Sequence, residues 1–311
     1  MAKKIIIDTD PGIDDALAIC TALRSPEFEI VGLTSVFGNA AIDQTTLNSL
    51  RLVELEDNTA IPVVKGCASS LVIPTPPLGT YVHGEDGFGN THMPPPKGRP
   101  LDISAAEFII QTVMSNPGEI TLVPIGPLTN IALALRIEPS IAQLVHEVVI
   151  MGGAAVVKGN ASPVAEANIW HDPHAADIVF AAGWPLTMVG LDVTTRVCMS
   201  SAYLDALVKA DTPPAHLIRQ ILPCYLSYFK QKLGLTTGIH THDPSAIAYL
   251  IDPGNFKTEQ WPVYVETVGS LAGQTTPDIQ SHWADQRKPI NVCVAVNADP
   301  ILEMIFERLT H

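Results

Sequence analysis

Short apolar runs of strand length recur along the chain and alternate with segments that show the periodicity of amphipathic helices. Strands are predicted at residues 3–7, 29–36, 61–66, 119–125, 145–151 and 185–191. Helices are predicted at residues 16–23, 41–57, 104–115, 129–137, 201–209 and 214–233, with two more that begin near Asp172 and Asp243. Because strand and helix alternate as far as about residue 192, the pattern predicts an α/β fold, with a mainly parallel open sheet flanked by helices in a Rossmann-like arrangement.

Two regions depart from this alternation. Apolar segments at residues 263–268 and 290–296 are predicted to be antiparallel strands, which would form a small C-terminal extension. Residues 67–103 hold seven prolines and no periodic pattern. A loop of that length is typical of a lid or a binding segment. We expect residues 1–311 to form a single domain that carries this long loop at about residues 67–103.

Four aspartates crowd into the turn that follows the first predicted strand. Asp8, Asp10, Asp14 and Asp15 lie within eight positions. Carboxylates packed this closely raise each other's pKa unless a cation lies among them, and oxygen donors favour a hard divalent metal. One aspartate could instead cap the following helix, but capping accounts for only one or two of the four. The turn therefore predicts a metal or catalytic site.

Other polar groups follow later strands and the long loop. Asn39 comes after the second strand, although it could serve only in a turn. A tight Gly-Pro turn follows Ile125 and would direct the Ile125 carbonyl toward the aspartates. His83, in the long loop, could line a ligand, and an exposed loop histidine is the alternative. Because ligands bind at the carboxyl ends of parallel strands, we expect these groups at one edge of the sheet.

Two segments in the second half of the chain carry further candidates. Asn160, Glu166 and Asn168 could hydrogen-bond vicinal hydroxyls, or could satisfy local turns and caps. His242 and Asp243 open a predicted helix. Asp243 could supply a metal ligand while His242 acts as a general acid or base, or the pair could be a helix cap with an incidental histidine.

One predicted helix carries an aromatic stripe. Tyr225, Tyr228 and Phe229 lie on one side of the helix at residues 214–233. A stripe with helical spacing is usually part of a core, although one ring could contact a planar ligand. Tyr228 is therefore a candidate ligand-binding residue.

Composition excludes several classes of function. The formal net charge of −14 argues against a nucleic-acid partner, which would need a basic face. No apolar run reaches the roughly 18 residues that suggest a membrane span, and no secretory leader is apparent. The five cysteines are scattered and never form a C-x-x-C pair, so neither a zinc site nor a disulfide framework is indicated. We expect a cytoplasmic protein.

These motifs together resemble the calcium-dependent nucleoside hydrolases. The segment from Asp8 to Asp15 is similar to their D-x-D-x-x-x-D-D fingerprint. The other motifs match in order and spacing, namely Gly38-Asn39, Gly126-Pro127-Leu128-Thr129-Asn130, Met151-Gly152-Gly153, Asn160 through Asn168, and His242-Asp243-Pro244. The resemblance covers essentially the full chain. It implies an enzyme that hydrolyses the N-glycosidic bond of ribonucleosides to free base and ribose, and it implies a homodimer or homotetramer.

The resemblance also implies a role for each candidate. One Ca²⁺ per subunit would be held by Asp10, Asp15, Asp243 and the carbonyl oxygen of Ile125. Asp10 would be the general base on a calcium-bound water, and His242 the proton donor to the departing base. The implied substrate contacts are Asp14 and Asn168 at the vicinal hydroxyls, Asn160 and Glu166 at the 5′-hydroxymethyl group, His83 at the base, and Asn39 as a buttress.

Three positions depart from the family pattern. Ala167 stands where many members carry Phe, which removes an aromatic wall. Ile125 replaces a frequent Thr, which matters little if only its carbonyl binds the metal. His240 is a second imidazole two positions before His242, and is a further candidate for substrate binding. The histidines favour a pyrimidine-preferring or broad enzyme over a purine-specific one.

Two other functions account for fewer of the residues. A haloacid-dehalogenase-like phosphatase would use Asp8 as a nucleophile, but it leaves Asn160, Glu166, Asn168, His242 and Asp243 without a role. A non-catalytic nucleoside- or ribose-binding protein on the same scaffold is the second alternative. All the expected ligands are present in the chain, which favours the enzyme.

Overall fold

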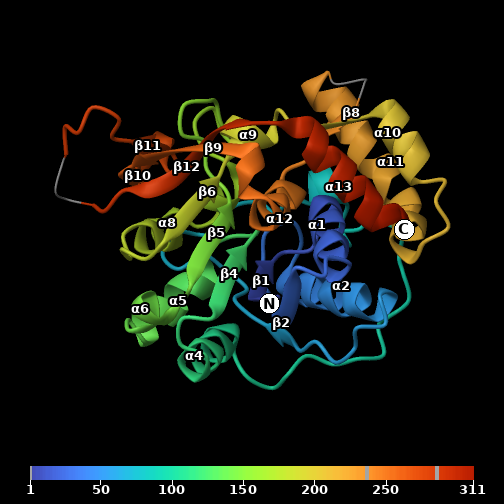
Figure 1. The fold of residues 1–311 in the computed structure, drawn as a ribbon, viewed down its shortest axis with the longest axis horizontal. Helices are drawn as coiled ribbons and strands as arrows, with labels where there is room; N and C mark the ends of the chain where they lie inside the picture. The colour runs from blue at the N-terminus through green and yellow to red at the C-terminus, as the bar shows by residue number, and fades with distance from the viewer. Residues whose placement is uncertain (1, 235–237, 284–286) are drawn as a thin grey trace.

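An eight-stranded sheet forms the centre of the structure, a computed structural model that describes residues 2–234, 238–283 and 287–311 (Figure 1). Its strand order is β3-β2-β1-β4-β5-β6-β12-β9. The strands are β1 (Lys3–Thr9), β2 (Phe28–Ser35), β3 (Val63–Lys65), β4 (Ile120–Pro124), β5 (Glu147–Met151), β6 (Leu186–Val189), β9 (Phe256–Trp261) and β12 (Ile290–Val296). All neighbours are parallel except β9 and β12. The predicted α/β fold with a mainly parallel sheet is confirmed.

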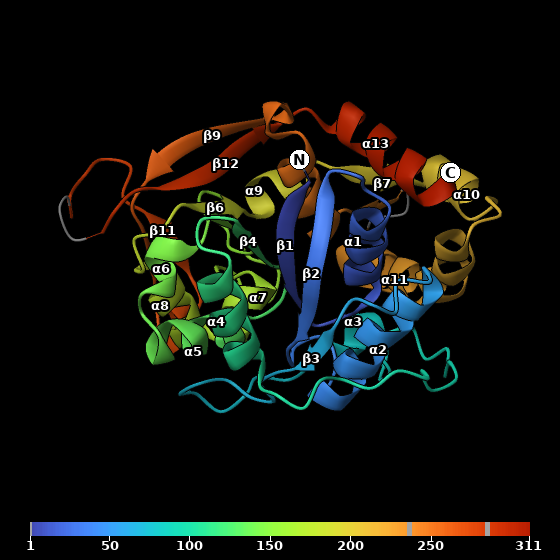
Figure 2. The ribbon, with the colours of Figure 1, turned by 60° about the horizontal axis from the view of Figure 1, so that its bottom comes forward.

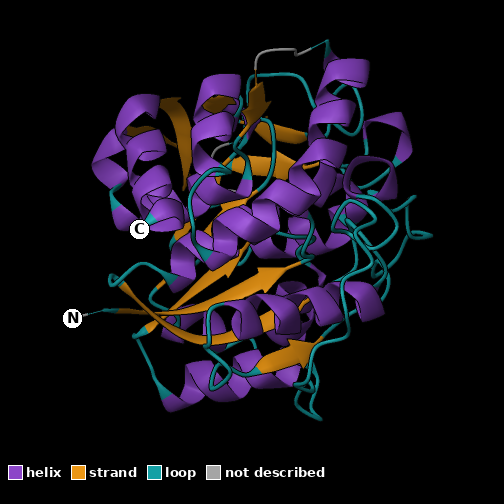
Figure 3. Cartoon of the chain, turned by 90° about the vertical axis from the view of Figure 1, so that its right-hand side faces the viewer, coloured by secondary structure: helices purple, strands orange, loops and turns teal. Residues whose placement is uncertain are grey.

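Strand β1 lies in the middle of the sheet because its side chains are apolar on both faces. Ile5, Ile6 and Ile7 are completely buried, as expected for a strand between two parallel neighbours. Successive side chains of a strand point to opposite faces, so Ile5 and Ile7 join one hydrophobic cluster and Ile6 joins the other. The sheet therefore separates two cores, each covered by helices (Figures 2 and 3).

The helices divide between these two faces. On the Ile5 face lie α1 (Ile13–Leu23), α2 (Ile42–Leu55), α11 (Pro213–Leu233), α12 (Asp243–Ile251) and α13 (Ala298–Thr310). On the Ile6 face lie α4 (Ala105–Ser115), α5 (Thr129–Ile137), α6 (Ile141–Leu144) and α8 (Pro173–Phe180). Shorter elements are α3 (Thr80–His83), α7 (Ala167–His171), α9 (Leu191–Thr194), α10 (Ser201–Leu207), and the 3₁₀ turns Pro253–Asn255 and Gly269–Leu271. Among the described ranges, no helix has the length and apolar character of a membrane span.

The strands of the C-terminal quarter pair differently from the prediction. Strand β12 enters the main sheet, parallel to β6 and antiparallel to β9, instead of pairing with the segment at residues 263–268. That segment contains β10 (Val263–Val265), which pairs antiparallel with β11 (Thr275–Pro277) in the small C-terminal extension. A second small sheet joins β7 (Cys198–Ser200) to β8 (Gly238–His240). Strand β9 was not predicted, because its Phe-Lys-Thr-Glu-Gln-Trp sequence has little apolar character.

The long loop at residues 67–103 is tied to the carboxyl ends of the central strands. Helix α3 is its only helix, and the amide of Gly79 donates to the carbonyl of Gly38 at 2.8 Å. The Asn48 side-chain amide donates to the carbonyls of both Pro11 and Asp86, at 2.9 Å each. The loop therefore closes over the turn that follows β1 and forms one wall above the strand ends.

Candidate active site

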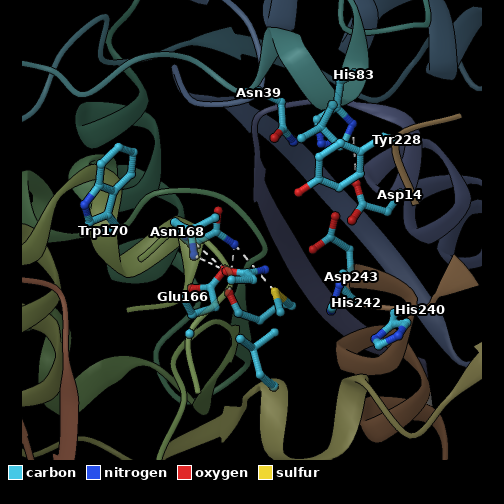
Figure 4. Close-up of a pocket in the computed structure, with 18 of the residues that line it drawn as sticks. Asp14, Asn39, His83, Glu166, Asn168, Trp170, Tyr228, His240, His242 and Asp243 are labelled. Carbon is cyan, nitrogen blue, oxygen red and sulfur yellow. Dashed lines mark hydrogen bonds and ion pairs between the residues drawn. The ribbon is translucent and has the colours of Figure 1, made fainter. Parts of the chain in front are cut away.

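A pocket of about 330 Å³ opens at the carboxyl ends of the central strands. It gathers predicted site residues from both halves of the chain (Figure 4). Those that line it are Asp14, Asn39, His83, Ile125, Asn160, Glu166, Asn168, Tyr228, His240, His242 and Asp243. Asp10 and Asp15 are almost completely buried and hydrogen-bond to Asn39 beside the pocket. The structure thus brings the predicted site residues together at one edge of the sheet.

Asp15 is fixed by the start of helix α1. Its Oδ2 accepts from the amide of Gly12 at 2.9 Å and from Asn39 Nδ2 at 2.8 Å, and its Oδ1 accepts from Thr9 Oγ1 at 2.5 Å. The carboxylate lies in the first turn of α1, where the helix dipole favours negative charge. The expectation that one aspartate could cap the following helix therefore applies to Asp15. Capping does not explain the other aspartates.

Asp10 has an oxygen that no described group satisfies. Its Oδ2 accepts from the Asn39 amide at 2.7 Å, whereas Oδ1 is buried and has no hydrogen-bond partner among the described residues. Only a glycine fits beside it, because a Cβ atom on Gly126 would lie 2.6 Å from Oδ1. Burial, together with the charges of Asp15 and Asp14, raises the pKa of Asp10 well above its usual range. A cation beside Oδ1 would offset the repulsion from Asp14 and Asp15 and stabilise the charged form of Asp10.

Asp14, Asp15 and Asp243 come close enough to share one ion. One oxygen from each lies within 4.8 Å of the others, and Figure 4 shows Asp14 and Asp243 pointing toward one another. Burial raises the pKa of Asp243 well above its usual range, with the charges of Asp14 and Asp15 adding to the effect. An all-oxygen set of this kind suits a hard cation. This trio contains Asp14, which the sequence assigned to the substrate, and lacks Asp10.

Asp8 lies behind the site and does not line the pocket. Its Oδ1 accepts from Asn130 Nδ2 at 2.7 Å and from the Thr34 hydroxyl, so it joins β1 to β2 and α5. Burial raises the pKa of Asp8 to about 7. Because Asp8 is fully buried and does not line the pocket, it is not placed to act as the nucleophile that a phosphatase of the haloacid-dehalogenase type would need.

Glu166 and its neighbours build the opposite wall. Glu166 caps α7, accepting from the amides of Asn168 at 2.9 Å, Ile169 at 3.2 Å and Gly153 at 3.0 Å. Burial raises the pKa of Glu166 to about 7, even though these amides oppose the shift. Asn160, at the rim, accepts from the amide of Ala167 at 3.0 Å. Local capping therefore accounts for much of this segment, while its side chains still line the pocket.

Asn168 holds the strand ends together at the centre of the site. Its Nδ2 donates to the carbonyl of Ile125 at 2.9 Å and to that of Met151 at 3.1 Å. Two donated bonds leave the side-chain oxygen as the acceptor of this amide. The Ile125 carbonyl lies at the pocket as predicted, and it keeps a second lone pair beyond its bond to Asn168.

His83 is buried and joins the long loop to helix α1. Its Nδ1 accepts from the backbone amide of Ile13 at 3.0 Å, and only 5% of its surface is exposed. An imidazole that accepts at Nδ1 carries its hydrogen on Nε2. Burial lowers the pKa of His83 to about 4, so the ring is neutral at physiological pH. The alternative of an exposed loop histidine is wrong.

A second group of rings forms the remaining wall. His242 is partly buried, and its Nδ1 lies 2.9 Å from Thr194 Oγ1. Burial, with smaller contributions from His240 and His83, lowers the pKa of His242 to about 3. The His240 ring lies 5.7 Å from that of His242 between centroids. Tyr228 is half-buried against Tyr81, 5.9 Å away between ring centroids.

Known proteins share this sequence and this fold. The family model described as inosine-uridine preferring nucleoside hydrolase matches residues 5–303. The chain belongs to that family. It is 43% identical to the inosine-uridine preferring nucleoside hydrolase of Leishmania major, with 90% of this chain and 89% of the relative covered. It is 40% identical to probable uridine nucleosidase 2 of Arabidopsis thaliana, with 99% and 97% covered. The solved plant nucleoside hydrolase PpNRh1 superposes with a TM-score of 0.96 at 36% identity, covering 100% of this chain and 99% of that one.

Membership in the nucleoside hydrolase family confirms the predicted class of enzyme, an N-glycosidase that hydrolyses ribonucleosides. The comparisons favour neither the phosphatase nor the non-catalytic binding protein. For this nucleoside hydrolase, the cluster of aspartates is a site that could hold a metal ion.

Sequence reasoning missed two residues of the site. Tyr225 was placed only in an aromatic stripe, yet its hydroxyl donates to Asp14 Oδ2 at 2.9 Å. Thr194, at the end of α9, contacts His242. The position of Thr194 after a strand was the available signal, whereas nothing local in the sequence links Tyr225 to Asp14. Tyr225 and Phe229 are buried, so the stripe is largely core, as its spacing indicated.

Proposed function

We propose that this nucleoside hydrolase cleaves ribonucleosides with one calcium ion per subunit and with Asp10 as the general base, and that it prefers pyrimidine nucleosides or accepts a broad range. The observation that carries this proposal is the set of buried, mutually repelling carboxylates at the floor of the pocket. No arrangement of neutral hydrogen bonds satisfies all of them among the described residues, since Asp10 Oδ1 and Asp14 Oδ1 have no partner.

The proposed calcium ligands are Asp10, Asp15, Asp243 and the carbonyl of Ile125. All are oxygen donors, and the unpartnered Oδ1 of Asp10 fits a hard cation. When bound, calcium would offset the carboxylate charge and lower the pKa of water in the site.

Asp14 and Asn168 are proposed to hold the 2′- and 3′-hydroxyls of ribose. Asp14 Oδ1 is buried without a partner and can accept a hydroxyl hydrogen, while Asn168 presents its carbonyl oxygen. Glu166 uses about three of its four lone-pair positions for backbone amides, which leaves one for the 5′-hydroxyl beside Asn160. Asn39 supports the site by holding Asp10 and Asp15.

The chemistry follows from this ring of oxygens. Cleavage of a glycosidic bond builds positive charge on the sugar, which preorganised carboxylates stabilise without reorganising. Asp10 would take the proton of the attacking water, because its buried Oδ1 has no hydrogen-bond partner among the described residues and a carboxylate can accept that proton. His242 would assist the departing base from the other side, with His83, Tyr228 and His240 around that base.

The specificity proposal is tested by comparing kcat/KM for uridine, cytidine, inosine and adenosine. We expect uridine or cytidine to lead, with measurable cleavage of inosine, in keeping with relatives named for uridine and for inosine and uridine. Cleavage of purine nucleosides alone would overturn the preference and leave the enzyme class intact.

We also propose that residues 1–311 act as one domain in a cytoplasmic homodimer or homotetramer. Light scattering coupled to gel filtration tests the assembly, since one chain has a mass of 33.3 kDa. A mass near twice or four times that value is expected, and a monomer at micromolar concentration would contradict it.

A further inference from the structure

Thr194 carries a buried hydroxyl with a single partner. Its Oγ1 lies 2.9 Å from His242 Nδ1, and no other hydrogen bond of this hydroxyl is present among the described residues. The next residue behaves differently, because Thr195 Oγ1 donates to the carbonyl of Leu191 one helical turn earlier. Thr194 therefore turns its hydroxyl away from its own helix and toward the pocket histidine.

The backbone on both sides fixes this contact. The amide of Leu191 donates to the carbonyl of Gly153 at 2.9 Å, which docks α9 on the turn after β5. On the other side, the amide of Thr241 donates to the carbonyl of Val197 at 2.9 Å, which docks the residue before His242. Thr194 Oγ1 and His242 Nδ1 thus meet because two separate backbone contacts place them, and the side chains have little freedom to separate.

The single partner decides which atom donates. If His242 donated from Nδ1, the buried hydroxyl hydrogen of Thr194 would have no acceptor, and an unsatisfied buried donor is costly. If Thr194 donates to Nδ1, both groups are satisfied and the imidazole hydrogen lies on Nε2. We infer that Thr194 is a positioning residue that holds His242 as the Nε2–H tautomer, with that N–H available to a nucleobase in the pocket. The inference rests on the proposed role of His242 at the departing base.

This arrangement changes how His242 would assist the reaction. The neutral Nε2–H donates a hydrogen bond and keeps its proton. As the N-glycosidic bond breaks, its electron pair passes to the base, and the N–H stabilises the negative charge that develops there. The hydroxide part of water bonds to C1′, its proton passes to Asp10, and the base takes up a proton from solvent. His242 thus acts as a hydrogen-bond donor instead of the proton donor expected from the sequence.

The test compares Thr194→Val, which removes the hydroxyl at nearly constant shape, with Thr194→Ser, which keeps it. The substrates are uridine and 4-nitrophenyl β-D-ribofuranoside, whose leaving group departs as a stable anion without such a donor. We expect Thr194→Val to lower kcat for uridine by about tenfold, the lower end of acid–base assistance, with little change in KM. We expect turnover of the nitrophenyl riboside by Thr194→Val to stay unchanged. Thr194→Ser, which keeps the hydroxyl, should cleave uridine at the rate of the unaltered enzyme.

Two controls separate positioning from general damage. Thr121→Val removes another buried hydroxyl, one on β4 without a hydrogen-bond partner among the described residues, and it should leave both activities intact. In the double variant Thr194→Val/His242→Ala, the loss for uridine should equal that of His242→Ala alone, because Thr194 acts through His242. Additive losses, or equal loss with both substrates, would overturn the inference.

The tautomer itself can be read in the unaltered enzyme. Nitrogen-15 NMR of labelled histidine should show His242 protonated on Nε2, and a mixture of tautomers in Thr194→Val. A His242 resonance protonated on Nδ1 contradicts the inference even if a variant fails to fold. If His242→Ala cleaves uridine at full rate while the NMR shows Nε2–H, the proposed role of His242 fails and the inferred tautomer stands.

Discussion

The two ends of the pocket are held by different kinds of contact. On the carboxylate side, Asp15 accepts three hydrogen bonds and Asp10 is fixed by the amide of Asn39, from donors at the end of β1 and in the turns after β1 and β2. On the base side, Tyr228 and His240 are partly exposed and meet their neighbours mainly through ring contacts of 5.5–5.9 Å between centroids. The carboxylate side is therefore set by the sheet, whereas Tyr228 and His240 on the base side are set by packing between α11, β8 and the long loop.

That difference separates chemistry from selectivity. Groups that stabilise charge must be held in place before the reaction, and backbone amides at strand ends do this well. Groups that recognise the base need only fit its outline, so ring packing suffices. Changes on the carboxylate side should therefore lower kcat for every nucleoside, while changes at Tyr228 or His240 should alter KM and the ranking of substrates.

The largest effect is expected for Asp10→Asn. The amide keeps the size of the side chain but cannot accept the proton of water, so kcat should fall by about 10³-fold or more for all nucleosides. Circular dichroism and thermal melting verify that the variant is folded. Retention of more than a tenth of the turnover would show that Asp10 is not the base.

Tyr225→Phe should have the next largest effect. It removes the hydroxyl that donates to Asp14 Oδ2, so Asp14 is less well placed for the ribose hydroxyls. We expect kcat/KM for uridine to fall about tenfold, as for the loss of a hydrogen bond to a charged group, and discrimination against 2′-deoxyuridine to weaken. Tyr203→Phe is the matched control, because its hydroxyl bonds to the carbonyl of Leu302 instead. If discrimination between uridine and 2′-deoxyuridine is unchanged, Asp14 does not bind the ribose hydroxyls.

Tyr228→Ala tests whether a ring on the base side determines KM and the ranking of substrates. Loss of a half-buried ring should raise KM by about three- to tenfold, in line with roughly 1 kcal/mol for an aromatic contact. The change should differ between uridine and inosine, because their bases differ in outline. An equal loss of kcat for every nucleoside would place Tyr228 with the catalytic groups and break the proposed division.

Asp8→Asn should affect turnover least and stability most visibly. Folded Asp8 has a pKa raised to about 7 by burial, whereas the unfolded side chain titrates near 4. The folded protein therefore holds an extra proton between these pH values, and the free energy of unfolding falls as pH rises through that window, by up to about 4 kcal/mol. Urea melts from pH 4 to 8 should show a smaller decline for Asp8→Asn. Identical slopes would contradict the raised pKa.

The sequence predicted the parts of the fold that depend on local pattern. The parallel strands β1 to β6 were predicted because each is a short apolar run, and a predicted helix follows all of them except β3. Strand β9 and the pairing of β12 were not, because β9 is partly exposed and strand pairing is set at long range. In the last quarter, the predicted segment at residues 263–268 contains β10, which pairs antiparallel with β11 instead of with residues 290–296.

The same limit applied to the site. The aspartates and Asn39 could be placed because they follow predicted strands whose ends share an edge. Contacts between distant segments could not be placed. Tyr225 and Asp14 are 211 positions apart, and Thr194 and His242 are 48 apart, so only the folded chain reveals that they touch. Sequence identified the carboxylate side well, and the structure was needed for the contacts that orient it.

Release of free ribose from uridine, measured as reducing sugar in phosphate-free buffer, tests the central proposal most directly. The enzyme is first stripped with a calcium chelator and then assayed with and without added calcium. We expect ribose and uracil in equal amounts with calcium, and a loss of at least about 10³-fold in rate without it, because repelling carboxylates would be left without their cation. The same rate in the stripped enzyme, or no ribose from uridine, cytidine, inosine or adenosine when calcium is present, would contradict it.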